Sequence, residues 1–155
     1  MKNVLSILTI ALFSAAMILN SGCTKKEGCT DADASNYDTE ADKSCSGCCT
    51  YKGTSVIWYG KTTADGLVND GSSSLTYYVD NQIVGSSAAN IYYTSSPNCG
   101  QNGTITIEKD LGNSKQKSFS YKVVDDADDI IWEGTLEFDA TKCTAYELTW
   151  SSKKK

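Results

Sequence analysis

The sequence predicts an all-β fold, an antiparallel sandwich of seven or eight short strands that is immunoglobulin-like in the loose sense. Short segments rich in Val, Ile, Thr, Tyr, Phe and Trp recur from Lys52 to Trp150, and turn signals separate them. Several segments alternate apolar and polar residues, which predicts strands with one buried and one wet face. No window shows a helical stripe of useful length.

Eight segments fit this strand pattern. They are, in order, Thr54–Tyr59, Ser74–Asp80, Gln82–Ser86, Asn90–Thr94, Thr104–Lys109, Lys117–Val124, Ile131–Phe138 and Thr144–Trp150. Turns are predicted at Asp65-Gly66, Asn69-Asp70-Gly71, Asp80-Asn81, Pro97-Asn98, Asn102-Gly103 and Leu111-Gly112-Asn113. The alternation is clearest at Phe119, Tyr121 and Val123, and again at Leu136 and Phe138. These side chains are predicted to share the buried face.

The composition excludes most familiar enzyme chemistry. The chain has 155 residues and contains no His and no Arg. Without imidazole there is no Ser-His-Asp or Cys-His machinery, and without guanidinium there is no bidentate phosphate clamp. The net charge of −5 gives no electrostatic footprint for nucleic acid. We therefore expect a protein that is not an enzyme and has no nucleic-acid partner.

The first 22 residues have the pattern of an export signal. Lys2 precedes an uncharged apolar stretch from Val4 to Leu19, and the small residues Ser21 and Gly22 follow. This order predicts a signal peptide over 1–22. A transmembrane helix is the alternative, but a stretch of about 16 residues is shorter than the ~20 that cross a bilayer.

The run Leu19-Asn20-Ser21-Gly22-Cys23 resembles the lipobox of bacterial lipoproteins. The resemblance implies that Cys23 carries the lipid, palmitate included, and that residues 23–28 form a lipidated tether. No Asp follows Cys23, which by the same resemblance favours the outer membrane over inner-membrane retention. We expect an exported protein of the outer membrane or cell surface, with the membrane as a partner through its lipid anchor.

Six further cysteines predict disulfide bonds, because thiols outside the cytoplasm are normally oxidised. They are Cys29, Cys45, Cys48, Cys49, Cys99 and Cys143. The sequence leaves their pairing open. A zinc site is the alternative, since Cys45 and Cys48 have zinc-knuckle spacing and Cys29 and Cys49 could complete four thiolates.

The acidic segment 29–51 contains most of these cysteines. Its residues Gly28–Asp38, with Cys48-Cys49-Thr50-Tyr51 behind them, resemble a cysteine-bounded motif of Bacteroidota surface proteins. The resemblance implies a Cys29–Cys49 pair, and closing a loop of this size stabilises by roughly 3 kcal/mol on the chain-entropy model.

The same segment matches the spacing of a calcium loop. Positions 1, 3, 5, 7, 9 and 12 of such a loop are Asp31, Asp33, Ser35, the Tyr37 carbonyl, Thr39 and Asp42. Asn36 stands where the loop needs a tight turn. Ca²⁺ is therefore a candidate cofactor, and a set of solvated acidic turns is the alternative.

A second acidic run, Asp125-Asp126-Ala127-Asp128-Asp129, has the highest charge density in the chain. Oxygen ligands suit a cation, but such runs are more typical of solvated hairpin loops. Glu133, Glu137 and Glu147 could in principle supply paired carboxylates for glycoside hydrolysis. On strands they are instead predicted to point to water, so no catalytic residue is expected.

The body from 52 to 150 also resembles a known family. The features that carry the resemblance are, in order, Gly53-Thr54 and Trp58, Leu75–Asp80 with Val84-Gly85, Tyr93–Gly100, Trp132–Leu136 and Lys142-Cys143-Thr144. Their order is similar to that in a family of small lipoproteins of Bacteroidota. The resemblance implies a Cys99–Cys143 disulfide and a PEGA-like β-sandwich, and it brings no catalytic residues. Residues 151–155 are predicted to be a frayed basic tail.

Three tyrosines are candidate binding residues. Tyr59, Tyr78 and Tyr92 each belong to an adjacent aromatic pair, and strand neighbours face opposite sides. A row of exposed aromatics could stack against sugar rings or anchor a protein, whereas ordinary strand composition is the alternative. We expect a non-catalytic accessory or structural binding module with a protein or glycan ligand, or, as the alternative, a carbohydrate-binding lipoprotein of a glycan-uptake system.

Overall fold

The computed structural model describes residues 25–151 of the chain. The predicted signal peptide 1–22, the lipidation site Cys23 and residues 152–155 of the predicted tail lie outside the described residues. The described part contains nine strands and one helix. These are β1 Glu27–Gly28, β2 Lys43–Ser44, β3 Tyr51–Trp58, α2 Lys61–Asn69, β4 Ser74–Val79, β5 Gln82–Ala88, β6 Ile105–Gly112, β7 Gln116–Asp125, β8 Ile130–Asp139 and β9 Cys143–Glu147. No helix from 25 to 151 has the length and apolar character to cross a membrane.

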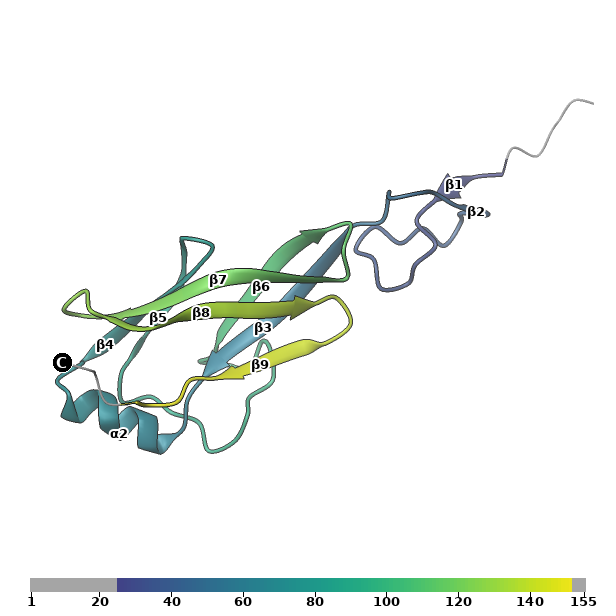
Figure 1. The fold of residues 1–155 in the computed structure, drawn as a ribbon. Coiled ribbons are helices and arrows are strands. Elements are labelled where there is room, and N and C mark those ends of the chain that lie inside the picture. Colours follow the sequence, from purple (N-terminus) through teal and green to yellow (C-terminus); the bar gives the residue numbers. More distant parts are fainter. Residues whose placement is uncertain (1–24, 152–155) are drawn as a thin grey trace, which may run out of the picture.

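The strands form three sheets. The shortest pairs β1 with β2 inside the Cys-rich segment. The two larger sheets have the strand orders β6-β3-β9 and β5-β4-β7-β8. Figure 1 shows the Cys-rich segment projecting from one end of the larger sheets, while α2 lies at the opposite end. The molecule therefore has two distinct ends, one formed by the Cys-rich segment and the other by α2.

The prediction of an all-β fold is confirmed, because strands predominate and both larger sheets contribute side chains to one buried core. The alternation predicted from the sequence is also confirmed: Val123, Leu136 and Phe138 have no exposed surface. Phe119 meets Phe138 edge to face, with ring centres 5.5 Å apart. Apolar side chains spaced by two along β7 and β8 thus supply a large part of the core.

The predicted turn at Asp80-Asn81 joins β4 to β5. Both residues have positive φ, 54° at Asp80 and 59° at Asn81. Two consecutive left-handed residues are the signature of a type I′ hairpin turn, and Asp and Asn tolerate that region better than most residues. The short polar pair therefore sets the register of this hairpin.

The prediction that the chain lacks a helix is wrong, and so is the turn predicted at Asp65-Gly66, which lies within α2. The buried residues of α2 are Thr63, Ala64 and Leu67. A helix of nine residues with so few apolar positions has no stripe that periodicity detects. Packing against the core, more than intrinsic propensity, accounts for such a short helix.

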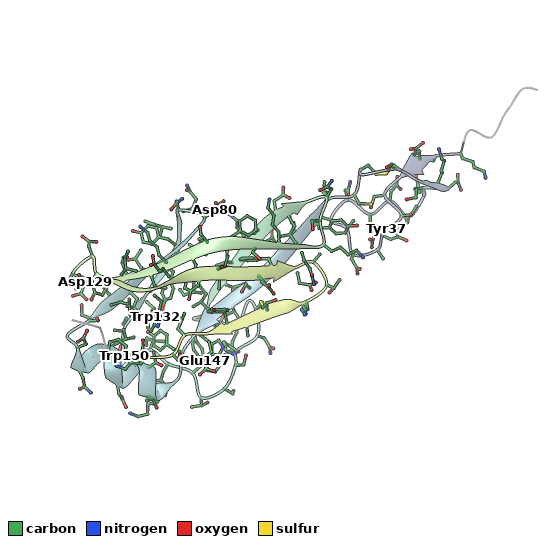
Figure 2. The ribbon with its side chains drawn as sticks, in the orientation of Figure 1. Tyr37, Asp80, Asp129, Trp132, Glu147 and Trp150 are labelled. Carbon is green, nitrogen blue, oxygen red and sulfur yellow. A yellow bond between two sulfur atoms is a disulfide. The ribbon has the colours of Figure 1, made fainter. Side chains whose placement is uncertain are left out.

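Two contacts with the chain end hold α2 in place. Thr63 Oγ1 donates to the Leu148 carbonyl at 3.3 Å and accepts the Trp150 N–H at 3.1 Å. The Trp150 ring covers Gly66, where an ideal Cβ would lie only 2.5 Å from its Cδ1 atom. Figure 2 shows Trp150 beside the helix. Gly66 thus allows a close approach that any larger residue would obstruct.

The strand predicted over Asn90–Thr94 is wrong, because this segment is a loop. Only single backbone hydrogen bonds tie it to its neighbours, such as Tyr93 N–H to the Tyr59 carbonyl at 3.0 Å. Its β-branched and aromatic residues satisfy strand propensity, but no strand lies in register beside it.

The sheet pairing is not wholly antiparallel, which corrects another part of the fold prediction. β9 runs parallel to β3, with Thr54 opposite Cys143 and Trp58 opposite Glu147. The turn after β8 carries the chain into the other sheet, and the Leu148 N–H extends the ladder to the Trp58 carbonyl at 2.8 Å. Pairing between residues so far apart in sequence leaves no local signal.

The contact between Gly66 and Trp150 generates a test of the helix packing. Gly→Ala in an exposed helix normally stabilises by about 1 kcal/mol. Here Gly66→Ala is expected to destabilise by about 1–3 kcal/mol, because the new methyl group displaces the indole. Urea unfolding of the two proteins measures the change.

Thr62→Ala is the matched control, since Thr62 is exposed on the same helix. It is expected to raise stability by about 0.5 kcal/mol, because Ala has the higher helix propensity and no packing contact with Trp150 is disturbed. A stabilising Gly66→Ala would contradict the proposed packing.

Candidate functional site

Two disulfides cross-link residues 29–51, which we call the stem. Cys29 pairs with Cys49, with Cα atoms 5.1 Å apart, and Cys45 pairs with Cys48, with Cα atoms 5.8 Å apart. The disulfide prediction is confirmed, and the first pair is the one that the cysteine-bounded motif implied. The four cysteines of the zinc alternative are thus all oxidised in this structure.

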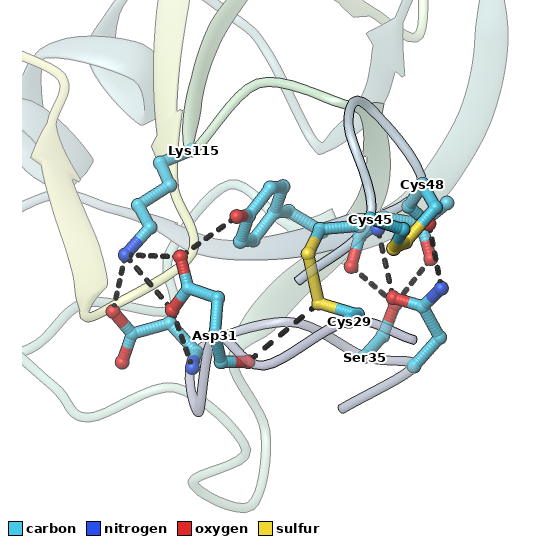
Figure 3. The surroundings of a disulfide bond; sticks show 11 residues. Cys29, Asp31, Ser35, Cys45, Cys48 and Lys115 are labelled. Atoms are coloured by element: carbon cyan, nitrogen blue, oxygen red, sulfur yellow. Dashed lines mark hydrogen bonds and ion pairs between the residues drawn. A yellow bond between two sulfur atoms is a disulfide. The ribbon is translucent and has the colours of Figure 1, made fainter. Parts of the chain in front are cut away.

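A lysine of the body joins the stem through two carboxylates (Figure 3). Lys115 Nζ lies 2.8 Å from Asp31 Oδ2 and 2.7 Å from Asp33 Oδ2. The Tyr51 hydroxyl donates to the same Asp31 carboxylate at 2.8 Å, and Lys115 lies 5.7 Å from the centre of the Tyr51 ring. We call Asp31, Asp33, Tyr51 and Lys115 the clamp. It connects the stem to the link between β6 and β7 and to the first residue of β3.

The clamp perturbs the titration of its members. The hydrogen bond from Lys115, followed by that from Tyr51, lowers the pKa of Asp31 to about 2. The hydrogen bonds to Asp31 and Asp33 raise the pKa of Lys115, and that to Asp31 raises the pKa of Tyr51. Each shift favours the charge state that holds the contact at neutral pH.

The residues predicted as a calcium loop do not surround one point. Asp31 and Asp33 come together, but on Lys115. Ser35 Oγ donates to the Thr50 carbonyl at 2.9 Å, Asp42 Oδ2 accepts the Lys26 N–H at 3.4 Å, and Tyr37 and Thr39 are exposed. Across residues 25–151 no group of three or more His, Cys, Asp or Glu side chains could hold a metal ion.

The acidic run after β7 forms a hydrogen-bonded turn. Asp125 Oδ1 accepts the N–H groups of Ala127 and Asp129 at 3.0 and 2.9 Å. Asp126 Oδ1 accepts the Ser73 N–H at 2.8 Å. This hydrogen bond is the largest of the causes that lower the pKa of Asp126 to about 2. The run therefore caps the β7–β8 hairpin and ties it to the start of β4.

The three candidate tyrosines do not form one surface, and the prediction for Tyr59 is wrong. Its side chain is buried, and its hydroxyl donates to the Ala88 and Ala89 carbonyls at 3.3 Å. Tyr78 is half-buried, with Lys122 Nζ 4.7 Å from its ring centre. Tyr92 alone of the three is exposed, at 42%. A tyrosine in the loop, rather than one in a strand, therefore reaches solvent.

Tyr92 forms one wall of a hollow that we call the α2 groove. The groove has a volume of about 380 Å³ and is lined by Ala64, Asp65, Val68, Asn69, Asn90 and Tyr92. Val68 is half exposed on its floor. Lys61 Nζ lies at its edge, 2.7 Å from Asp65 Oδ2 and 6.0 Å from the centre of the Tyr92 ring. The groove combines an apolar floor with an aromatic ring, two amides and one carboxylate.

Buried contacts hold both walls of the α2 groove. Leu67 has no exposed surface and anchors the helical wall beneath Val68. The loop wall is held by Ala89, whose N–H donates to the Ser73 carbonyl at 3.0 Å, and by the Tyr59 hydroxyl beneath it. Tyr59 is thus a positioning residue for the loop that carries Tyr92.

Two further hollows flank Asp139, with volumes of about 490 and 340 Å³. Several of their charged side chains are paired. Lys52 lies 2.7 Å from Glu108, Lys142 lies 3.7 Å from Asp139, and Asp139 accepts the Gln116 amide at 2.8 Å. Neither hollow presents an exposed aromatic ring, because Phe138, the one aromatic residue that lines them, is buried.

The larger of these hollows also contains the Cys99–Cys143 disulfide, with Cα atoms 5.8 Å apart. This is the pair implied by the resemblance to Bacteroidota lipoproteins. It fastens the long loop between β5 and β6 to the first residue of β9. The bond therefore links the loop that supplies Tyr92 to an edge strand of the three-stranded sheet.

The glutamates considered for glycoside hydrolysis are exposed. Glu133 and Glu137 lie on β8, and Glu147, labelled in Figure 2, ends β9. Their predicted orientation toward water is confirmed. Sequence reasoning missed Lys115, Asn69 and Asn90: the first has no local signal, and Asn90 falls in the segment assigned to a strand.

Comparisons of the chain with protein-family models, with curated proteins and with solved structures find no match.

The Cys99–Cys143 bond is expected to carry much of the stability of the body. It closes a loop with a sequence separation of 44. Replacing both cysteines by Ala should lower the free energy of unfolding by roughly 4 kcal/mol on the chain-entropy model. Urea unfolding under non-reducing conditions measures the loss.

The Cys45–Cys48 pair, with a sequence separation of only 3, provides the comparison. Replacing it with two serines removes a far smaller loop, so global unfolding should change much less. Equal losses from the two replacements would argue against loop closure as the source of the stability.

The clamp predicts a local pH dependence. Because the pKa of Asp31 is depressed to about 2 from its usual 3.8, the contribution of the clamp is complete above roughly pH 4. It is lost as the pH falls through about 2. Lys115→Met should return the pKa of Asp31 toward 3.8, because the dominant donor disappears. Carbon-detected NMR titration of the Asp31 carboxyl measures the shift.

Lys117→Met serves as the control. Lys117 lies near Lys115 in sequence, but its ammonium faces the Phe119 ring at 5.1 Å rather than a carboxylate. It should leave the Asp31 titration unchanged. An Asp31 pKa that stays near 2 without Lys115 would disprove the assigned cause.

Proposed function

We propose that this protein is an exported, lipid-anchored, non-catalytic binding module of the outer membrane or cell surface. In this proposal Cys23 carries the lipid, the stem spaces the body from the membrane, and the β-rich body is the displayed domain. The clamp is the observation that carries it. A salt-bridged, aromatic-lined junction favours a stem of fixed direction over a flexible linker.

The two ends of the molecule support this orientation. The chain enters the stem from the side of the proposed lipid, and the stem meets the body at Tyr51, the first residue of β3. Figure 1 shows α2 at the opposite end, and four of the residues that line the α2 groove belong to this helix. A module anchored through Cys23 would therefore present the α2 groove away from the membrane surface.

A role without catalysis agrees with how the carboxylates are used. Asp125 and Asp126 accept backbone N–H groups, whereas Asp31 and Asp33 bind Lys115. The chain also contains no His to act as a general base near neutral pH. These side chains serve the fold and its junction, which supports a binding or structural role.

The finer fold class belongs to the same proposal. We propose that the two larger sheets form an immunoglobulin-like or PEGA-like sandwich, as in the small lipoproteins of Bacteroidota that the chain resembles. Support comes from the shared core of the two sheets and from the Cys99–Cys143 bond. The parallel pairing of β9 with β3 is a departure from a purely antiparallel sandwich.

A carbohydrate-binding lipoprotein of a glycan-uptake system is the second candidate. The α2 groove favours it, because an exposed tyrosine and side-chain amides border the same hollow. It differs from the first candidate in the ligand alone, since both place the body on a lipid anchor.

Lipidation at Cys23 is the decisive test of the proposal. Cells fed an alkyne analogue of palmitate should label the wild-type protein, and the label should fractionate with the membrane. Cys23→Ser should abolish the label, because the acylated thiol is gone. In-gel fluorescence of the purified protein after click chemistry is the measurement.

Ser21→Ala is the control, because it keeps a small residue before the cysteine and should retain the label. Labelling that persists in Cys23→Ser, or a wild-type protein that takes up no lipid, would refute the anchor.

A further inference from the structure

We infer that the α2 groove is a binding site for a neutral saccharide, with the Tyr92 ring against one face of a sugar ring. The side-chain amides of Asn69 and Asn90 would bond to its hydroxyl groups. The inference deepens the proposed function by naming the ligand class of the displayed domain. The inference depends on the α2 groove alone, because the lipid anchor affects only the direction in which the groove faces.

The lining of the groove matches the chemistry of a sugar. A pyranose ring presents a face of C–H groups surrounded by hydroxyls that both donate and accept. Tyr92 offers a flat aromatic face that is 42% exposed, and Val68 continues the apolar surface. An asparagine amide supplies two donors and one acceptor, which suits hydroxyl partners of either kind.

The two amides are available to a ligand. Within residues 25–151 the side chains of Asn69 and Asn90 make no hydrogen bond to the protein. The other two hollows have no exposed aromatic ring, since Phe138, the one aromatic residue that lines them, is buried. The α2 groove therefore differs from both of them in having unused side-chain amides next to an exposed ring.

The charge of the groove selects a neutral ligand. Asp65 is the one charged residue among the six that line it, and Lys61 at its edge is held 2.7 Å from that carboxylate. An acidic sugar would meet Asp65 and a protein of net charge −5. A neutral sugar meets no such repulsion, and Asp65 can accept from its hydroxyls.

The size and rigidity of the α2 groove also suit a small ligand such as a sugar. Its volume of about 380 Å³ lies at the lower end of the ~300–1,000 Å³ usual for small-molecule sites. Leu67 and the Tyr59 hydroxyl hold the two walls from the core side. A groove whose walls are already fixed loses little conformational freedom on binding, which favours a weakly interacting ligand such as a sugar.

The first experiment uses the full-length lipidated protein in detergent micelles. Native gels are cast with one soluble polysaccharide each: a β-glucan, dextran, mannan, xylan, galactan or the acidic polygalacturonate. We expect at least one neutral polymer to retard the protein and polygalacturonate to leave it unretarded. Calorimetry with the matching oligosaccharide then gives the Kd.

Variants at both ends of the molecule test the assignment. Tyr92→Ala should raise the Kd at least tenfold, whereas Tyr92→Phe should stay within about threefold because it keeps the ring. Tyr37→Ala is the matched control, since Tyr37 is 46% exposed but lies on the stem (Figure 2). Asn69→Ala and Asn90→Ala should each raise the Kd about three- to tenfold, the usual effect of one lost hydrogen bond.

Unchanged melting temperatures would show that the variants fold. The inference is overturned if no neutral polymer retards the protein, if polygalacturonate is the polymer that does, or if Tyr92→Ala binds as well as wild type. A loss of retardation in Tyr37→Ala as large as the loss in Tyr92→Ala would also overturn the inference. None of these results touches the lipid label at Cys23, so the failure of this inference and that of the anchor are distinguishable.

Discussion

The Lys115 ammonium holds two parts of the chain together that are far apart in sequence. Its contacts with Asp31 and Asp33 join an acidic, cross-linked segment to the β-rich body, and the Tyr51 hydroxyl completes the junction. The clamp does not act alone, because Cys29, Ala34 and Tyr51 are buried in the same cluster as the core of the body. The direction of the stem, and hence the separation of the two ends of the molecule, follows from this burial together with the ion pairs of Lys115.

Local patterns in the sequence were enough to predict the strands that build the core. Alternation along β7 and β8 identifies Val123, Leu136 and Phe138, because a strand has one side chain per face every two residues. The features that escaped prediction are those decided by packing between distant segments. A nine-residue helix under Trp150 and a parallel strand beside β3 leave no periodic trace.

The candidate site shows the same division. Sequence spacing suggested that Asp31 and Asp33 act together, and they do, but their partner is a lysine that no spacing could identify. The aromatic pairs were expected to place one member of each outside the core. At the end of β3 and within β4 the pairs do divide, since Tyr59 and Tyr77 are buried while Trp58 and Tyr78 are half-buried. The pair at Tyr92 lies in a loop, so neither of its members is in the core and Tyr92 is exposed. Asn69 and Asn90 line the same groove only because α2 and that loop are adjacent.

The position of β3 has a mechanical consequence. The stem enters the body at Tyr51, and the chain leaves β3 only a few residues before α2, so any pull between an anchored stem and an object held at the helix runs along this strand. β3 is flanked on both sides, by β6 and by β9. Tension along its axis loads those two hydrogen-bonded ladders in shear, where many bonds resist together, instead of opening them one by one like a zipper.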